Sequence, residues 1–180
     1  MSVGGSEMRQ IRTSGKTGDR EAMNLLSCHT VADYFLLQVD VQAGDTISNL
    51  KLQKLCYYAQ AWNLALSERP LFSERIEAWA HGPAIPALYR RFRQYGWGSI
   101  DPQNLRTNPL DELDRDDIEF LDEVWSHYGH YSGRQLELMT HKEAPWKDAY
   151  GNRRRGEGCT EEITHNSMRE FYGRKLTKAA

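Results

Sequence analysis

Apolar side chains recur at helical spacing along most of the chain, beginning near residue 30. The first set occupies positions i, i+1, i+4, i+5 and i+8 of one segment, which places them on one face of a helix. Its members are Val31, Ala32, Phe35, Leu36 and Val39. We predict a helix from Thr30, as its N-cap, to about Val41, with Gly44 as the stop signal.

The second periodic segment is apolar on two faces. It begins at Ser48 or Asn49 and continues to about Leu66. One face is a wide arc, made by Leu52, Leu55, Cys56, Ala59, Trp62 and Leu66, and Tyr57, Ala61 and Leu64 lie roughly opposite. A helix with two apolar faces is contacted by neighbours on both sides, so we expect this helix to run through the middle of the domain.

The period changes to two after Pro70. Phe72, Glu74, Ile76 and Ala78 alternate with Ser73, Arg75, Glu77 and Trp79, and this period of two with Phe, Ile and Trp is typical of a short strand. We expect one strand or small hairpin around residues 70–80, ended by the Gly82-Pro83 pair.

Helical spacing then returns for the rest of the chain. The predicted helices cover residues 84–95 with Pro86 in the first turn, 114–128 with Asp114 as N-cap, 132–141 with a Ser132/Gln135 capping box, one or two turns at "PWKDAY", and 164–172. The fold class is therefore mainly α, a compact domain of about five to seven helices with one small β element.

The first residues have a different composition. Residues 1–24 are rich in Gly, Ser, Thr and charged side chains, which favours a flexible extension over 1–28 and a single domain over 29–176.

Composition and charge limit the function classes. The chain has 180 residues, 39% of them hydrophobic, and a net charge of -2, which gives no electrostatic footprint for nucleic-acid binding. No apolar run reaches the roughly 18 residues of a membrane span, and the N-terminus has no signal-peptide core, so we expect a cytoplasmic protein and no membrane partner. Three widely spaced cysteines indicate reduced thiols.

The motifs of common enzymes are missing. The sequence has neither a Gly-x-Ser-x-Gly elbow nor a phosphate loop. His127, His130, His141 and Glu143 form the one candidate metal cluster, but Gly129 interrupts the helix that would align the first two, and we expect no metal there. A helix-turn-helix over 114–142 is disfavoured by eight acidic side chains in residues 111–123.

Two features could carry binding. Lys51, Lys54 and Tyr58 share a helix face at i, i+3 and i+7, and they form either a notch for an acidic side chain or phosphate, or two solvated lysines whose stems cover apolar surface. "WAHGPAIP" combines a rigid corner with a loop that presents His81, and the two roles are compatible.

Several blocks together resemble the Panacea domain family of phage-associated GepA-like proteins and SocA-like antitoxins. They are "VADYFL", "NLKLQKLCYYAQAWNLAL", "PLFSERIEAWAHGPAIPALYRRFRQYG" and "LELMTHKEAPW", within residues 29–172. The family-motif positions with a structural role are Leu52, Leu55, Trp62, Trp79, Gly82, Pro83, Tyr89, His141, Glu143 and Trp146. His81 departs from the family, which usually has Tyr before Gly-Pro.

The resemblance implies an antitoxin that neutralises a small cognate toxin by direct binding, with no catalysis, no cofactor and no small-molecule substrate. An adaptor that delivers the toxin to a Clp-type protease is one alternative, and a metal-dependent hydrolase built on the histidine cluster is another. The residues that we expect to contact the partner are Lys51, Lys54, Tyr58, His81, Arg90 and Arg91.

Overall fold

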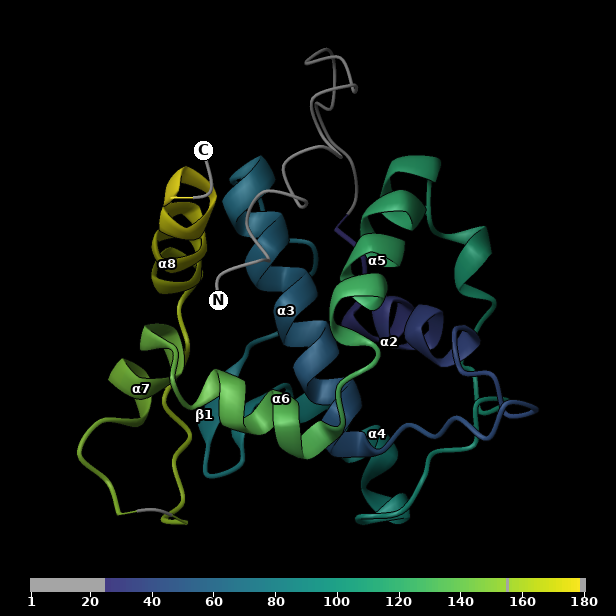
Figure 1. Cartoon of the computed structure of the whole chain (residues 1–180), viewed down its shortest axis with the longest axis horizontal. Coiled ribbons are helices and arrows are strands. Elements are labelled where there is room, and N and C mark those ends of the chain that lie inside the picture. The colour runs from purple at the N-terminus through teal and green to yellow at the C-terminus, as the bar shows by residue number, and fades with distance from the viewer. Residues whose placement is uncertain (1–24, 155, 179–180) are drawn as a thin grey trace.

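Helix α3 (Asn49–Ser67) passes through the middle of the molecule, and the other elements pack around it (Figure 1). The computed structural model describes residues 25–154 and 156–178. The other elements of this part are α2 (Cys28–Leu37), β1 (Glu77–Trp79), β2 (Gly82–Ala84), α4 (Pro86–Phe92), the 3-10 turns η1 (Arg93–Tyr95) and η2 (Pro109–Asp111), α5 (Arg115–Tyr128), α6 (Gly133–Thr140), α7 (Ala144–Tyr150) and α8 (His165–Lys178). The prediction of a mainly helical domain with one small β element is confirmed.

The central position of α3 follows from its two apolar faces. Ser48, one of the two predicted N-cap candidates, caps the helix and accepts a hydrogen bond from the Lys51 backbone N–H. Helix α3 contacts α2, α4, α5, α6, α8 and β2. The Trp62 ring is 1% exposed, its Nε1 donates to the Tyr128 hydroxyl at 2.8 Å, and it meets the Tyr172 ring edge to face. Trp62 therefore joins α3 to both α5 and α8.

The β element is a hairpin, and the prediction that the Gly82-Pro83 pair ends it is wrong, because this pair lies in the second strand. β1 and β2 are antiparallel, with Glu77 opposite Ala84 and Trp79 opposite Gly82. The other edge of β1 is also paired, since the Ala78 N–H donates to the backbone carbonyl of Glu161 at 2.8 Å and the Ile163 N–H donates to the backbone carbonyl of Ile76 at 2.9 Å. Gly82 has φ +92°, a conformation that favours glycine.

The predicted N-cap of the first helix, Thr30, is wrong by three residues. Helix α2 begins at Cys28 and is capped by Ser27, whose Oγ accepts from His29 N–H. A tertiary contact decides the start, because Glu74 accepts hydrogen bonds from both Ser27 and Cys28. The Thr30 hydroxyl instead donates to Glu112 at 2.6 Å.

The predicted end of that helix is also wrong, since α2 ends at Leu37 and not near Val41. Asp40 forms a side-chain turn, accepting from the backbone N–H groups of Gln42 and Ala43, and this turn competes with further helix.

Helices α5 and α6 keep their predicted starts, and α8 extends beyond its predicted end. The helix predicted over 84–95 is shorter, since α4 covers Pro86–Phe92 and the 3-10 turn η1 follows it. Asp114 caps α5 and Ser132 caps α6, each in a full capping box. Helix α8 continues through Gly173 to Lys178, because Leu176 is buried and Lys175 pairs with Glu143 at 3.1 Å.

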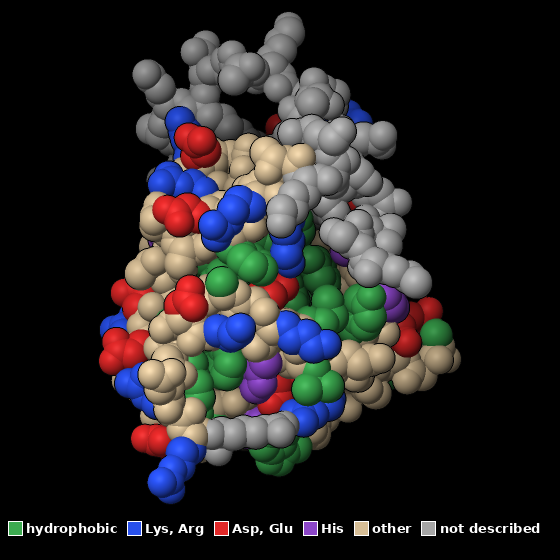
Figure 2. Space-filling view, turned by 60° about the vertical axis from the view of Figure 1, so that its left-hand side comes forward, with side chains coloured by type: hydrophobic (Ala, Val, Ile, Leu, Met, Phe, Trp, Pro, Cys, Tyr) green, Lys and Arg blue, Asp and Glu red, His purple; other side chains and the backbone are tan. Residues whose placement is uncertain are grey.

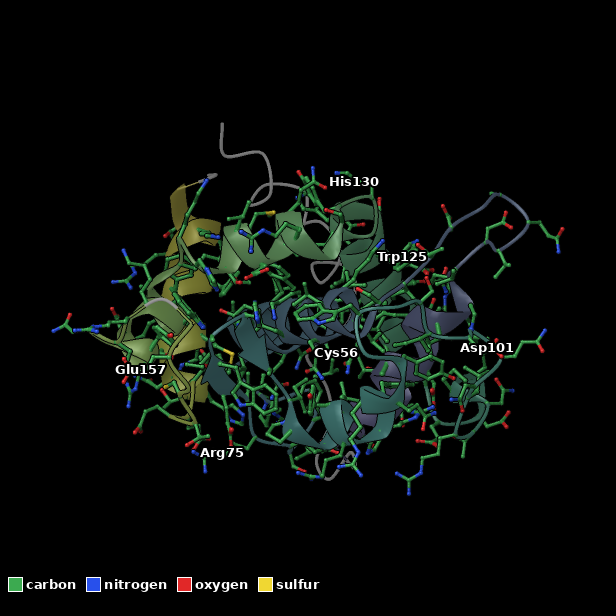
Figure 3. All side chains as sticks on the ribbon, turned by 90° about the horizontal axis from the view of Figure 1, so that it is seen from below. Cys56, Arg75, Asp101, Trp125, His130 and Glu157 are labelled. Carbon is green, nitrogen blue, oxygen red and sulfur yellow. The ribbon has the colours of Figure 1, made fainter. Side chains whose placement is uncertain are left out.

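The three cysteines are free thiols within the described part of the chain, and all are buried. In Figure 3 Cys56 of α3 lies near the middle of the molecule, whereas Arg75, Asp101, His130 and Glu157 lie toward its periphery. In residues 25–154 and 156–178 no helix has the length and apolar character to cross a membrane. Residues 1–24 of the extension predicted over 1–28 lie outside the described residues. Within the described part, the Leu26 N–H donates to the Leu71 carbonyl, and Leu26 forms a β-bridge with Phe72.

We predict that Trp62→Ala lowers the free energy of unfolding by about 3–5 kcal/mol, because it removes a buried ring and leaves the Tyr128 hydroxyl without its donor. Urea unfolding followed by circular dichroism measures the change. The matched control is Trp97→Ala, whose ring is 75% exposed and whose loss should change stability by less than about 0.5 kcal/mol. Equal losses in the two variants would contradict the central role of Trp62.

Candidate functional site

Lys54 of α3 is buried under the hairpin. Its side chain is 1% exposed, and its Nζ donates to the backbone carbonyl of Pro83 at 2.9 Å. A Cβ on Gly82 would lie 2.7 Å from Lys54 Cε, so the glycine is needed for this close approach as well as for its backbone angle. Burial lowers the pKa of Lys54 to about 7, with Glu137 opposing the shift.

Two glutamines of α3 hold the chain on either side of the hairpin. Gln60 accepts from Leu71 N–H at 2.7 Å and donates to the Phe72 carbonyl at 2.8 Å. Gln53 accepts from Ile85 N–H at 2.7 Å. Because these side chains are buried and satisfy backbone groups, the position of the hairpin on α3 is well defined.

The hairpin turn presents His81 to solvent above a buried carboxylate. His81 Nδ1 lies 3.1 Å from Glu137 Oε1, and Arg134 contacts the other oxygen at 2.8 Å. Burial alone would raise the pKa of Glu137, but the hydrogen bonds and charges of Arg134 and His81 outweigh it and lower that pKa. Glu137 thus fixes the orientation of two exposed side chains.

Aromatic pairs connect the hairpin to the segment that follows it. Trp79 meets Tyr89 of α4 edge to face at 4.9 Å, and His81 meets Trp97 in the same way at 5.2 Å. Tyr89 is 44% exposed and Trp97 75%. We call Trp79, His81, Tyr89 and Trp97, with Arg134 beside them, the hairpin surface.

The three α3 residues that were predicted to share one helix face lie in three different environments. They are Lys51, Lys54 and Tyr58. Lys51 donates to the Gly129 carbonyl at 2.6 Å, where it completes the C-terminus of α5, and it lies over the Trp125 ring. Tyr58 is fully buried and stacks on Tyr128 at 4.0 Å. Of these three residues only Lys54 lies under the hairpin, whereas the partly buried Lys51 and the buried Tyr58 contact α5 and its C-terminal end.

The predicted arginines also differ from each other. Arg91 forms an ion pair with Asp33 at 2.6 Å and donates to the Asn104 carbonyl. Asp33 is fully buried and also accepts from Arg106 N–H, so Arg91 holds α4 to α2. Arg90, by contrast, is exposed.

The "THKEAPW" segment anchors α7. Glu143 accepts from the Tyr172 hydroxyl at 2.6 Å and pairs with Lys175, and its burial raises its pKa although both partners oppose the shift. Trp146 donates from Nε1 to the Trp79 carbonyl at 2.9 Å and stacks on His141 at 4.0 Å. The motif thus joins α7 to α8 and β1. In the described part of the chain no group of three or more His, Cys, Asp or Glu side chains could hold a metal ion.

Sequence patterns did not identify Trp97 and Arg134 as members of the hairpin surface. They also did not identify Glu137 as the buried carboxylate beneath it. The one available signal was a Trp between two glycines in a polar segment, at Gly96–Gly98, because a large apolar ring in such a setting is often exposed.

Comparison with known proteins gives one family and one curated relative. Residues 52–147 match the family model described as "Antitoxin SocA-like, Panacea domain". The protein named Antitoxin SocA from Caulobacter vibrioides is 35% identical over 109 residues, which cover 56% of this chain and 58% of the relative. The chain therefore spans less than two thirds of that relative's length. No solved structure matches significantly.

We predict a pH-dependent difference in stability between the protein and Lys54→Met. An unfolded lysine keeps its proton up to about pH 10.5, whereas Lys54 in the folded state loses it near pH 7. Unfolding between these values takes up a proton, so the wild type gains stability relative to the variant as pH rises, by at most about 1.4 kcal/mol per pH unit.

Urea unfolding of both proteins at several pH values measures this difference. Lys142→Met, at an exposed lysine, is the matched control and should follow the wild type. A constant difference between wild type and Lys54→Met would mean that Lys54 remains charged when buried.

Proposed function

The chain belongs to the family "Antitoxin SocA-like, Panacea domain", and from this premise we propose that it is an antitoxin that neutralises a small toxin protein by binding it directly. Support comes from the family and from the relative named Antitoxin SocA. The mode of action in this proposal is recognition of a protein, with no catalytic step and no cofactor.

The hairpin surface is the part of the molecule that we assign to the toxin, and the exposed ring of Trp97 is the observation that carries the assignment. Interface energy is concentrated in a few aromatic and arginine side chains that become buried on binding. Here Tyr89, Trp97 and His81 are exposed, and Arg134 is held by Glu137, so these side chains lose little conformational freedom on binding.

The roles proposed for the predicted partner residues follow from where they lie. His81 belongs to the hairpin surface, and Arg90 is exposed on the helix that carries Tyr89, so both are available for direct contact. Lys54 supports the hairpin from within, and Arg91 holds α4, which carries Tyr89, to α2. Lys51 and Tyr58 instead contact α5 and its C-terminal end. Charge reversal at Lys54 or Arg91 would therefore disturb folding before binding.

The function is tested by co-purification of the protein from its native host, identification of the bound protein, and co-expression of the two. Growth arrest by the bound protein alone, relieved on co-expression, is the expected result. Growth arrest without relief would refute the proposal. Delivery to a Clp-type protease, the alternative that the resemblance implies, requires the same binding step and in addition a longer toxin half-life in a protease-deficient host.

We predict that Trp97→Ala weakens toxin binding about thirtyfold or more, the effect of losing one interface hot spot of about 2 kcal/mol. Isothermal titration calorimetry with the purified partner measures it. Leu110→Ala is the matched control, since Leu110 is an exposed apolar side chain on η2, outside the hairpin surface. Unchanged affinity of Trp97→Ala would show that the partner binds elsewhere.

A further inference from the structure

A groove lies beside the hairpin surface, along α7. It has a volume of about 870 Å³, and its walls come from the turn between β1 and β2, from α6, α7 and their connection, and from the residues after α7. The residues that matter for its chemistry are Ala80, Leu138, Lys142, Trp146, Lys147 and Arg153. Figure 2 turns the side that carries α7 and α8 toward the reader, and Lys and Arg side chains gather beside hydrophobic and His side chains in its lower half.

The charge of the groove is opposite to that of the whole chain. Lys142, Lys147 and Arg153 line it with one carboxylate, Asp148, although the chain has a net charge of -2. Lys142 and Lys147 are exposed, and no carboxylate of the described residues pairs with either ammonium group. Arg153, by contrast, forms an ion pair with Glu161 at 3.6 Å. Among the described residues, no carboxylate therefore competes with an anionic occupant for these two cations.

The groove also has an apolar wall. Leu138 is 42% exposed and lines the groove together with Ala80 and Trp146. His141, Trp146 and Tyr150 stack on one another at 4.0 and 4.5 Å, and both Trp146 and Tyr150 are nearly buried. Their ring faces are occupied by each other, which leaves little aromatic face for a nucleobase.

Main-chain pairing at β1 is not available to an occupant. One edge of β1 pairs with β2 and the other with residues 161–163, and the Trp79 carbonyl accepts from Trp146. An extended segment in the groove must therefore be held by side chains and not by strand addition.

We propose that this groove binds an acidic peptide segment of a protein partner, with carboxylates at Lys142 and Lys147 and one apolar side chain against Leu138, Ala80 and Trp146. The cations provide the preference for acidic sequence, and the apolar wall favours a peptide over a simple polyanion. The inference does not depend on the proposed function, because a peptide tests it without the toxin.

Fluorescence anisotropy with the full chain tests the proposal. The probes are a labelled peptide with glutamates around one leucine, the same peptide with lysines for glutamates, and inorganic polyphosphate. Saturable binding of the acidic peptide alone is expected. The double variant Lys142→Glu/Lys147→Glu should weaken it roughly tenfold, about the loss of two exposed ion pairs, and raised salt should weaken wild-type binding.

The double variant Arg169→Glu/Arg174→Glu is the matched control. It reverses two exposed cations on α8, away from the groove, and should leave the affinity unchanged. Equal losses in both double variants would reduce the effect to overall charge and overturn the proposal. Polyphosphate binding without acidic-peptide binding would also overturn it, in favour of a polyanion site. Because all four positions are exposed, circular dichroism should give unchanged folding in both variants.

Discussion

The hydrogen bond from Lys54 to the Pro83 carbonyl is the interaction on which the candidate binding surface depends. A charged lysine loses its hydration when it is buried, and it persists inside a protein only when the surrounding groups are placed to accept its hydrogen bonds. Here the α3 lysine reaches the one place in the hairpin where a glycine leaves room for its stem. The pKa of Lys54 is lowered for the same reason, because loss of hydration on burial disfavours the charged form.

The rest of the hairpin is positioned by the same principle. Gln53, Gln60 and Lys54 all extend from α3 and bond backbone groups that would otherwise be buried without partners. On the far side, Trp146 bonds the Trp79 carbonyl and Glu137 holds His81. The turn is therefore rigid although it is exposed, and a rigid exposed turn with aromatic neighbours loses little entropy on binding.

The hairpin surface and the basic groove along α7 meet at Ala80 and Leu138, which are next to His81 and Glu137. One surface is aromatic and the other is basic with an apolar wall, so they favour different parts of a partner. A partner that used both would gain from the linkage of two sites on one rigid support, as in other bivalent interactions.

Hydrophobic periodicity and local capping signals by themselves determined the helical fold, the central position of α3, the N-cap of α5, the capping box of α6 and the presence of one small β element, because these depend mainly on residues close in sequence. It did not determine where α2 starts, which Glu74 decides from 46 residues away, or where α8 ends. The periodicity placed Lys51, Lys54 and Tyr58 on one helix face, but it could not tell that Lys54 lies under the hairpin and Tyr58 against Tyr128. Burial of a polar side chain depends on which distant segment covers it and whether that segment offers a hydrogen-bond acceptor, and only the tertiary structure decides this.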